Sequence, residues 1–389
     1  MKIAVIGTKG IPAQFGGIER HCEELYPRIA ARGHEVTIFV RDWFTPLRGV
    51  YKGVYLRGAP TLNRKGLDAF AHTATASLIA LRGDYDIVHY HAIGPSLFSF
   101  VPKARRMKTI STVHALDWQR AKWGAGARQV LKAGEWASAR FPERTIVVSR
   151  DLQRYFRERY GREAVYIPNG VVPVESPRSA KLIEDFGIEP GRYILFLGRL
   201  VPEKGCHDLI AAYLASGIDL PLVVAGGSSH SDEYAQKLKR MAESAGAGVV
   251  GQTGTSGVGS PGQNTGRVVF TGNVEGELLT QLSGHAGLFV LPSMLEGLPI
   301  VVLEMLSLGV PVLASDIGPS REVLGDGQFG ALYRAGDQAD LKEKLLESLN
   351  SLDELKVKAE AGRKHVKTAN DWGKIAEETE KVYRESLAG

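Results

Sequence analysis

The first 40 residues, MKIAVIGTKGIPAQFGGIERHCEELYPRIAARGHEVTIFV, predict a strand, a helix and a second strand. Apolar runs at 2–6 and 35–40 predict two strands buried on both faces. Between them, a helix predicted over 18–31 carries Ile18, Cys22, Leu25 and Ile29 on one stripe, although Pro27 should kink it or remove a hydrogen bond. This order is typical of a parallel sheet covered by helices.

The same alternation continues through the chain. Further strands are predicted at 86–90, 108–113 and 144–148, and a second series at 193–197, 220–225, 267–270, 287–291 and 310–314. The fold class is therefore α/β. A length of 389 residues is sufficient for two domains, and the proline-containing stretch 168–178 has no periodicity and is typical of a linker. We expect one domain at 1–168 and the other at 169–371, with a final helix at 371–387 returning to the first domain, which thus includes 372–389.

Composition excludes several classes of protein. Hydrophobic residues make up 44% and charged residues 23% of the chain, which indicates a globular protein rather than a disordered or fibrous one. Cys22 and Cys206 lie far apart, in no disulfide framework or zinc-ligand spacing. The N-terminus does not resemble a signal peptide, and no apolar run reaches the roughly 18 residues of a membrane span. These features predict a cytoplasmic protein.

Positive charge is concentrated in residues 101–162. This segment contains 15 Lys and Arg against 5 Asp and Glu, whereas the whole chain has a net charge of only +5. It could face an anionic membrane at the inner surface of the cell, the phosphate of an acceptor, or solvent alone. Nucleic acid ranks last, because no aromatic platform or reading helix accompanies the charge. In contrast, the stretch 244–266 has 8 Gly and no charged residue before its end at Gly266, which predicts a flexible surface loop.

Glycines and basic residues follow the first strand of each predicted domain. Gly7 and Gly10, then Gly16 and Gly17, precede the first helix, where backbone N–H groups could approach a phosphate; a simple tight turn is the alternative. In the second domain, Arg199 and Lys204 follow the strand 193–197. Two cations at this edge of a parallel sheet suit a diphosphate and would stabilise it as a leaving group.

Two acidic residues and several histidines complete the candidate sites. Glu296, followed by Gly297 and Leu298, precedes a helix that begins near Pro299 and contains Glu304. Glu304 lies among apolar residues and needs a partner, which a ribose diol would supply; a solvent-facing glutamate is the alternative. His114 ends a first-domain strand, where a neutral imidazole could bind a sugar hydroxyl or transfer a proton. His89, His91 and Asp117 add polar groups nearby, but in no defined metal spacing.

Taken together, these motifs resemble the retaining glycosyltransferases of family 4. The resemblance rests on the following stretches: Gly16–Glu19, Val113–His114, Pro168–Val171, Gly198–Arg199, Glu203–Gly205, and Glu296 with Glu304. The opening residues 6–17 are similar to a bacterial rhamnosyltransferase-like subgroup involved in cell-surface polysaccharide synthesis. The resemblance implies the GT-B architecture, in which two Rossmann-like domains face each other across a cleft.

The resemblance also implies a role for each matching residue. Arg199 and Lys204 would hold the diphosphate of a nucleoside diphosphate sugar, Glu304 its ribose, and Glu296, with Gly297 and Leu298, the donor sugar. Gly16 and Gly17 would approach the diphosphate or sugar, with His114 near the transferred sugar. The expected reaction moves a hexose or deoxyhexose to a lipid-linked or polysaccharide acceptor with retention, through a front-face mechanism. We expect no cofactor or bound metal, because Arg199 and Lys204 supply the cationic role.

Three alternatives remain at this stage. A nucleotide-sugar epimerase of similar architecture would consume donor without acceptor, and a catalytically silent binding protein would hold the donor without turnover. An NAD-dependent dehydrogenase is disfavoured because the first glycine loop is not a G-x-G-x-x-G fingerprint.

Overall fold

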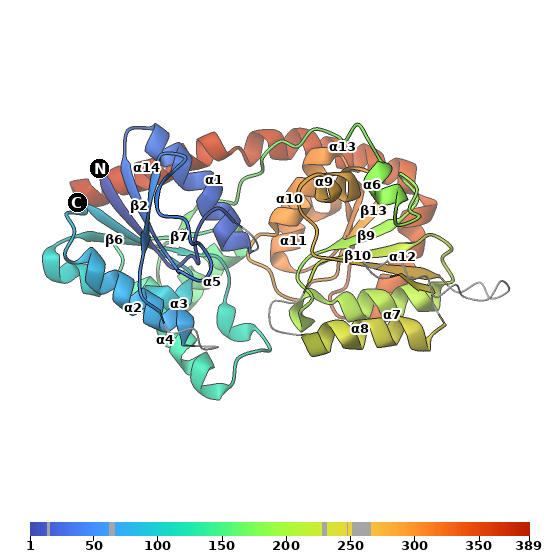
Figure 1. The fold of residues 1–389 in the computed structure, drawn as a ribbon, viewed down its shortest axis with the longest axis horizontal. Coiled ribbons are helices and arrows are strands. Elements are labelled where there is room, and N and C mark those ends of the chain that lie inside the picture. Colours follow the sequence, from blue (N-terminus) through green and yellow to red (C-terminus); the bar gives the residue numbers. More distant parts are fainter. Residues whose placement is uncertain (14–15, 62–66, 228–231, 247, 251–265) are drawn as a thin grey trace. The chain divides into compact units, whose positions relative to one another are not determined.

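A computed structural model describes residues 1–389 except 14–15, 62–66, 228–231, 247 and 251–265. The chain forms two compact units (Figure 1). Unit 1 contains Met1–Gly170 and Asn370–Gly389, and unit 2 contains Val171–Ala369. The boundaries expected from the sequence, 168 and 372, lie two residues from these limits.

Unit 1 is built on an eight-stranded sheet of order β3-β4-β2-β1-β5-β6-β7-β8. Its strands are β1 (Lys2–Ile6), β2 (Glu35–Val40), β3 (Gly49–Tyr51), β4 (Val54–Gly58), β5 (Ile87–His91), β6 (Lys108–Val113), β7 (Arg144–Val147) and β8 (Val165–Tyr166). All neighbouring pairs are parallel except β3 with β4.

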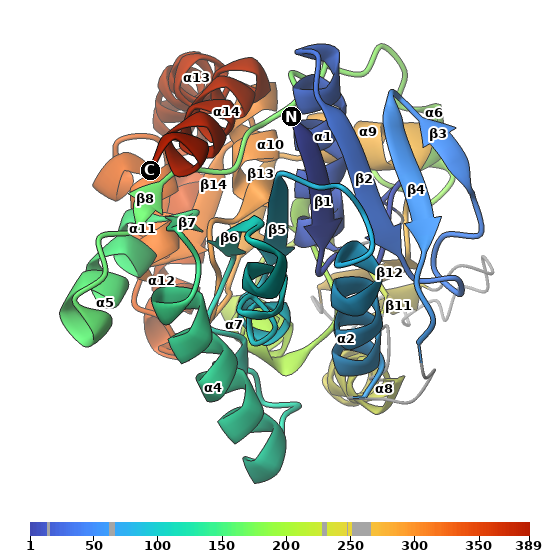
Figure 2. The ribbon, with the colours of Figure 1, turned by 90° about the vertical axis from the view of Figure 1, so that its left-hand side faces the viewer.

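Helices cover both faces of this sheet (Figure 2). They are α1 (Gly17–Ala31), α2 (Asp68–Ala80), α3 (Ile93–Ser96), α4 (Ala125–Arg140), α5 (Arg150–Tyr160) and α14 (Trp372–Ala388), with 3-10 turns η1 (Val101–Arg105) and η2 (Asp117–Gln119). α14 packs along α1, since Glu380 pairs with Arg32 and His34 at the end of α1.

Unit 2 contains a seven-stranded, wholly parallel sheet of order β11-β12-β10-β9-β13-β14-β15. Its strands are β9 (Ile194–Leu197), β10 (Leu222–Ala225), β11 (Gly248–Val250), β12 (Arg267–Gly272), β13 (Leu288–Leu291), β14 (Val312–Ser315) and β15 (Ala331–Tyr333). Ile194 and Phe196 of β9 and Leu222 and Val224 of β10 alternate with their neighbours and point to one hydrophobic core.

The helices of unit 2 also lie on both faces of its sheet (Figure 1). They are α6 (Lys181–Glu184), α7 (Cys206–Ser216), α8 (Asp232–Ser244), α9 (Gly276–Gly284), α10 (Ile300–Leu308), α11 (Gly318–Val323), α12 (Gln338–Asn350) and α13 (Leu352–Ala369), with turns η3 (Pro202–Lys204) and η4 (Gly325–Gly327). Among the described residues, no helix is long and apolar enough to cross a membrane.

The α/β prediction is confirmed, and several local predictions are corrected. β5 ends at His91 rather than residue 90, whereas α1 spans Gly17–Ala31 with Pro27 inside it, as predicted to within one residue. The glycine-rich stretch 244–266 is not entirely a loop, because Gly248–Val250 forms β11 and pairs with β12; residues 251–265 lie outside the described part of the chain. The segments β3, β4, β8 and β15 were not predicted, because runs of two to five residues carry little periodicity.

Candidate functional site in each unit

In unit 1, the loop after β1 lies at a topological switch point, since β1 is flanked by β2 on one side and β5 on the other. Gly7 has a φ of +114°, and a Cβ at this position would lie only 2.3 Å from the carbonyl oxygen of His91. Only glycine permits this approach between the ends of β1 and β5. Gly16, with a φ of +105°, precedes the first helical residue, Gly17, which is exposed.

Two buried glutamates of α1 hold this loop. Glu19 Oε1 accepts a hydrogen bond from the backbone N–H of Lys9 at 3.1 Å, and Glu23 Oε2 accepts one from Ala13 at 2.9 Å. Both side chains are buried, as expected for residues four apart on one helix face. This role was not predicted from the sequence, although two acidic residues on the buried stripe of an amphipathic helix were a signal for it.

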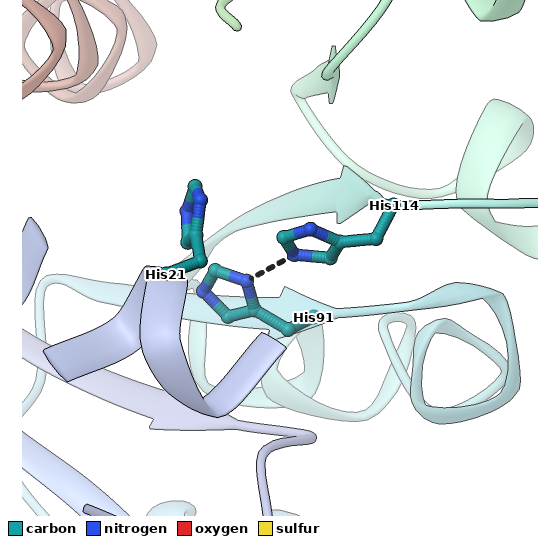
Figure 3. A group of neighbouring side chains, drawn as sticks. All are labelled: His21, His91 and His114. Carbon is teal, nitrogen blue, oxygen red and sulfur yellow. Dashed lines mark hydrogen bonds between the residues drawn. The ribbon is translucent and has the colours of Figure 1, made fainter. Parts of the chain in front are cut away.

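His114 follows the last residue of β6 and contacts two other histidines (Figure 3). Its Nε2 shares a 2.9 Å hydrogen bond with Nδ1 of His91, and its ring lies edge-on to His21 at a centroid distance of 4.8 Å. His21 Nδ1 in turn bonds Oδ1 of Asn169 at 3.0 Å. The structure therefore places His91 beside His114, as their strand ends predicted, and adds His21 from α1 to the cluster.

Burial keeps these imidazoles neutral at pH 7. It lowers the pKa of His21 to about 4, against a smaller opposing effect of the Asn169 hydrogen bond. It also lowers the pKa values of His91 and His114 well below the usual range, and neighbouring histidines lower them further. Each ring therefore carries one N–H and one lone pair.

Behind His91, a polar chain runs into the core of unit 1. Tyr26 Oη lies 2.5 Å from Nε2 of His91 and 3.0 Å from Nδ1 of His89. His89 also bonds Thr112 Oγ1 and Tyr383 Oη, each at 2.7 Å. His89 and His91 thus point to the α1 and α14 face of the sheet. Asp117 is not part of this group, because its carboxylate accepts from Arg120 Nε at 2.7 Å.

In unit 2, the switch point lies between β9 and β13, because the chain leaves β9 for β10 and returns to β13 on the other side. The loops that follow these two strands are in contact. Gly205 has a φ of +66°, and its Cβ would lie 2.0 Å from the carbonyl oxygen of Pro292. The backbone N–H of Met294 donates to the carbonyl of Glu203 at 2.9 Å.

The contact between these loops brings two predicted site residues together. Lys204 Nζ donates to Glu296 Oε1 at 2.5 Å, and the two side chains are only 16% and 11% exposed. Gly297 and Leu298 are buried beside Glu296. Lys204 and Glu296 were expected from the sequence to bind different parts of a ligand, and their pairing was not predicted.

The two remaining candidate site residues of unit 2 also follow β9 and β13. Arg199 is half-buried, two residues beyond the end of β9. Glu304 is half-buried in the middle of α10, between the buried Leu303 and Met305. The prediction that Pro299 begins this helix is accurate to one residue, since Pro299 is the N-cap and Ile300 the first helical residue.

Two family models match the chain, one in each half. Residues 15–175 match Glycosyltransferase Family 4, and residues 191–351 match Glycosyl transferases group 1. The glycogen synthase of Mycobacterium tuberculosis is 26% identical over 100% of this chain and 96% of its own length. The phosphatidyl-myo-inositol mannosyltransferase of Mycobacterium leprae is 26% identical over 95% of this chain and 92% of its own. The chain is a glycosyltransferase.

Solved structures show that this glycosyltransferase has the GT-B fold. The sucrose-phosphate synthase of Thermosynechococcus elongatus superimposes with a TM-score of 0.80 at 20% identity, over 100% of this chain and 99% of that one. Anabaena HepE in complex with UDP-glucose gives a TM-score of 0.77 at 19% identity, over 100% and 99% of the two chains.

Proposed function

We propose that the protein transfers a sugar from a nucleoside diphosphate sugar and that unit 2 binds this donor. The observation that carries the proposal is the half-buried Lys204–Glu296 pair at the β9/β13 switch point. Ligands of open α/β sheets bind at such a position. HepE, whose structure was solved with UDP-glucose, supports a donor of this class.

Lys204 has the capacity to bind phosphate while it remains paired. An ammonium group has three N–H donors, and Glu296 accepts one of them. The others can bind the diphosphate, with Arg199 as a second cation on the same connection. Negative charge grows on the diphosphate as the sugar leaves, so both cations stabilise the transition state more than the ground state. For this reason, we propose that transfer needs no metal ion and no cofactor.

The remaining roles follow the family resemblance. Glu296 accepts hydrogen bonds from hydroxyls of the donor sugar, next to the backbone of Gly297 and Leu298, and Glu304 accepts them from the ribose. In unit 1, neutral His114 hydrogen-bonds the transferred sugar, and the backbone at Gly16 and Gly17 lies close to the diphosphate or sugar.

We further propose a retaining, front-face transfer of a hexose or deoxyhexose, of which rhamnose is one candidate, to a lipid-linked or polysaccharide acceptor. The opening residues 6–17 support the deoxyhexose. A lipid-linked acceptor is supported by the M. leprae relative, whose name places a phosphatidyl lipid in its reaction. The enzyme would then work in the cytoplasm, at the inner face of the membrane.

The exposed face of α4 supports this location. Trp136 is 50% exposed, and Arg128 and Lys132, which lie on the same side of the helix at spacings of four residues, are exposed as well. Apolar and basic residues side by side suit an interface with anionic lipid. We expect binding to phosphatidylglycerol-containing vesicles, with a loss at about 0.5 M salt. Trp136→Ala should weaken vesicle binding, whereas Trp43→Ala, the control at another exposed tryptophan, should not. Equal vesicle binding at low and high salt would exclude an electrostatic contribution to the binding.

Thermal stability in the presence of UDP, GDP and dTDP tests the donor site. A nucleotide at 100 times its dissociation constant stabilises the protein by about 2.7 kcal/mol. Lys204→Met should weaken binding by about 10- to 150-fold, the value of a hydrogen bond to a charged group. Lys356→Met is the matched control, since this lysine is 62% exposed on α13.

A double variant separates direct binding from local damage. Lys204→Met leaves the half-buried Glu296 carboxylate without its partner, and Lys204→Met/Glu296→Gln removes that charge. If the double variant regained full nucleotide binding, Lys204 would have no direct contact with phosphate. If no nucleotide stabilised the wild-type protein, the assignment of unit 2 as the donor site would be wrong.

A further inference from the structure

Three histidines from separate parts of unit 1 converge on one point (Figure 3). His21 lies on α1, His91 ends β5 and His114 follows β6, and one ring nitrogen from each lies within 4.8 Å of the others. His21 and His91 are buried, and His114 is half-buried. We propose that His21, His91 and His114 form a binding site for a divalent transition-metal ion of the Zn²⁺ or Co²⁺ type.

The donor set determines which ions the site would take. Imidazole nitrogen suits Zn²⁺, Co²⁺, Ni²⁺ and Cu²⁺, whereas Mg²⁺ and Ca²⁺ prefer oxygen ligands. The three ligands include no carboxylate. Because the rings are neutral at pH 7, each has one lone pair for coordination, and no ring has to lose its proton to solvent when the ion binds.

Outer hydrogen bonds orient two of the three ligands. His21 Nδ1 bonds the amide oxygen of Asn169, and because that oxygen only accepts, the proton is on Nδ1 and the lone pair on Nε2. His91 Nε2 bonds Tyr26 Oη, which directs Nδ1 toward His114. A partner of this kind on the second ring nitrogen fixes the tautomer of metal-binding histidines.

A consistent set of protons exists along the path from His91 through Tyr26 and His89 to Thr112. His91 Nε2–H donates to Tyr26, the Tyr26 hydroxyl donates to Nδ1 of His89, and His89 Nε2–H donates to Thr112 Oγ1. Nδ1 of His91 is then an acceptor, and the proton of the 2.9 Å bond belongs to Nε2 of His114. On binding an ion, that proton moves to Nδ1 of His114, so all three rings stay neutral and no proton is released.

The three ring nitrogens need to move only slightly to coordinate an ion. A tetrahedral ion with nitrogen ligands at about 2.0–2.1 Å keeps them about 3.4 Å apart. The His91–His114 pair must open from 2.9 Å by about 0.5 Å, and a pair at the 4.8 Å limit must close by about 1.4 Å. His114 lies beyond the end of its strand and is half-buried, so rotation of its side chain supplies most of this change. Three protein ligands leave a fourth position for water.

This proposal is independent of the nucleotide-binding role of unit 2. It adds a metal-binding site in unit 1, and sugar transfer by the proposed mechanism does not require the ion. Since His114 is also proposed to contact the transferred sugar, an ion at the site would engage the same ring.

Titration of the full-length, metal-free protein with CoCl₂, in a preparation without a polyhistidine tag, tests the site. We expect one Co²⁺ per chain, with the intense visible absorption of a four-coordinate ion, and displacement by ZnCl₂ but not by excess MgCl₂. His114→Ala and His21→Ala should each reduce the affinity at least tenfold. His207→Ala, a half-buried histidine of unit 2, is the matched control and should leave the titration unchanged.

Circular dichroism establishes that each variant is folded, and His114→Gln replaces any alanine variant that is not. A wild-type protein without the four-coordinate spectrum, or equal affinity in wild type, His114→Ala and His114→Gln, would overturn the proposal. Either result would leave nucleotide binding by unit 2 unaffected, so the two proposals fail separately.

Discussion

Glu380 of α14 provides a quantitative test of how the C-terminal helix is held in unit 1. Its carboxylate is 7% exposed and accepts hydrogen bonds from Arg32, from His34 Nε2 at 3.0 Å and from Arg384 Nε at 3.0 Å. Hydrogen bonds from Arg32 and Arg384 lower its pKa from 4.5 to about 2. We expect Glu380→Gln to destabilise unit 1.

The lowered pKa of Glu380 determines how much this carboxylate contributes to the free energy of unfolding and how that contribution depends on pH. A carboxyl whose pKa falls from 4.5 to about 2 on folding contributes about 3 kcal/mol at pH 7. Arg32 and Arg384 are 38% and 66% exposed, and solvent screening reduces this to about 1–2 kcal/mol. Because the folded pKa is the lower one, the contribution is complete above about pH 4.5 and is lost as the pH falls toward 2.

Urea unfolding followed by tryptophan fluorescence measures this effect, because all five tryptophans lie in unit 1. The free energy of unfolding of Glu380→Gln should be about 1–2 kcal/mol below wild type at pH 7, with a smaller difference at pH 3.5. Glu377→Gln is the matched control, since Glu377 is 66% exposed and lies 3.6 Å from Arg32; it should change stability by less than about 0.5 kcal/mol. An equal difference at both pH values, or none at pH 7, would refute this reasoning.

Three further substitutions test packing and backbone geometry. Gly205→Ala should destabilise unit 2 by more than about 2 kcal/mol, since its Cβ would meet the carbonyl of Pro292; an unchanged melting temperature would contradict this close approach. Phe196→Ala should cost about 3–5 kcal/mol by leaving a cavity in the unit 2 core, measured by urea unfolding with circular dichroism. Ser149→Ala removes the N-cap bond to Leu152 N and should cost about 1 kcal/mol in the tryptophan assay, with Ser149→Asn closer to wild type.

The sequence was informative where a local pattern is strong. β1, β2 and β6 have the predicted bounds because each is a short run rich in aliphatic or β-branched residues next to a turn or helix signal. β3 and β4 were missed because Val50–Tyr51 and Val54–Tyr55 are two short pairs separated by Lys52–Gly53, too short for a periodic pattern. β15 has only three residues, and pairing with β14 holds it in place.

For the candidate sites, the sequence identified individual residues but few of the contacts between them. Arg199, Lys204, Glu296 and Glu304 were selected from their positions after strands and on a helix. The Lys204–Glu296 pair was not predicted, because 92 positions separate the two residues. Their contact depends on β9 and β13 being neighbours in the sheet.

The sequence by itself determined the α/β class and the residues that follow each strand, because hydrophobic periodicity and glycine placement are local properties of the chain. Only the tertiary structure decided that His21, His91 and His114 meet. Strand order places β5 between β1 and β6, and α1 packs on the same sheet, so three residues distant in sequence share one buried point. Such convergence depends on packing between elements, which no window of sequence contains.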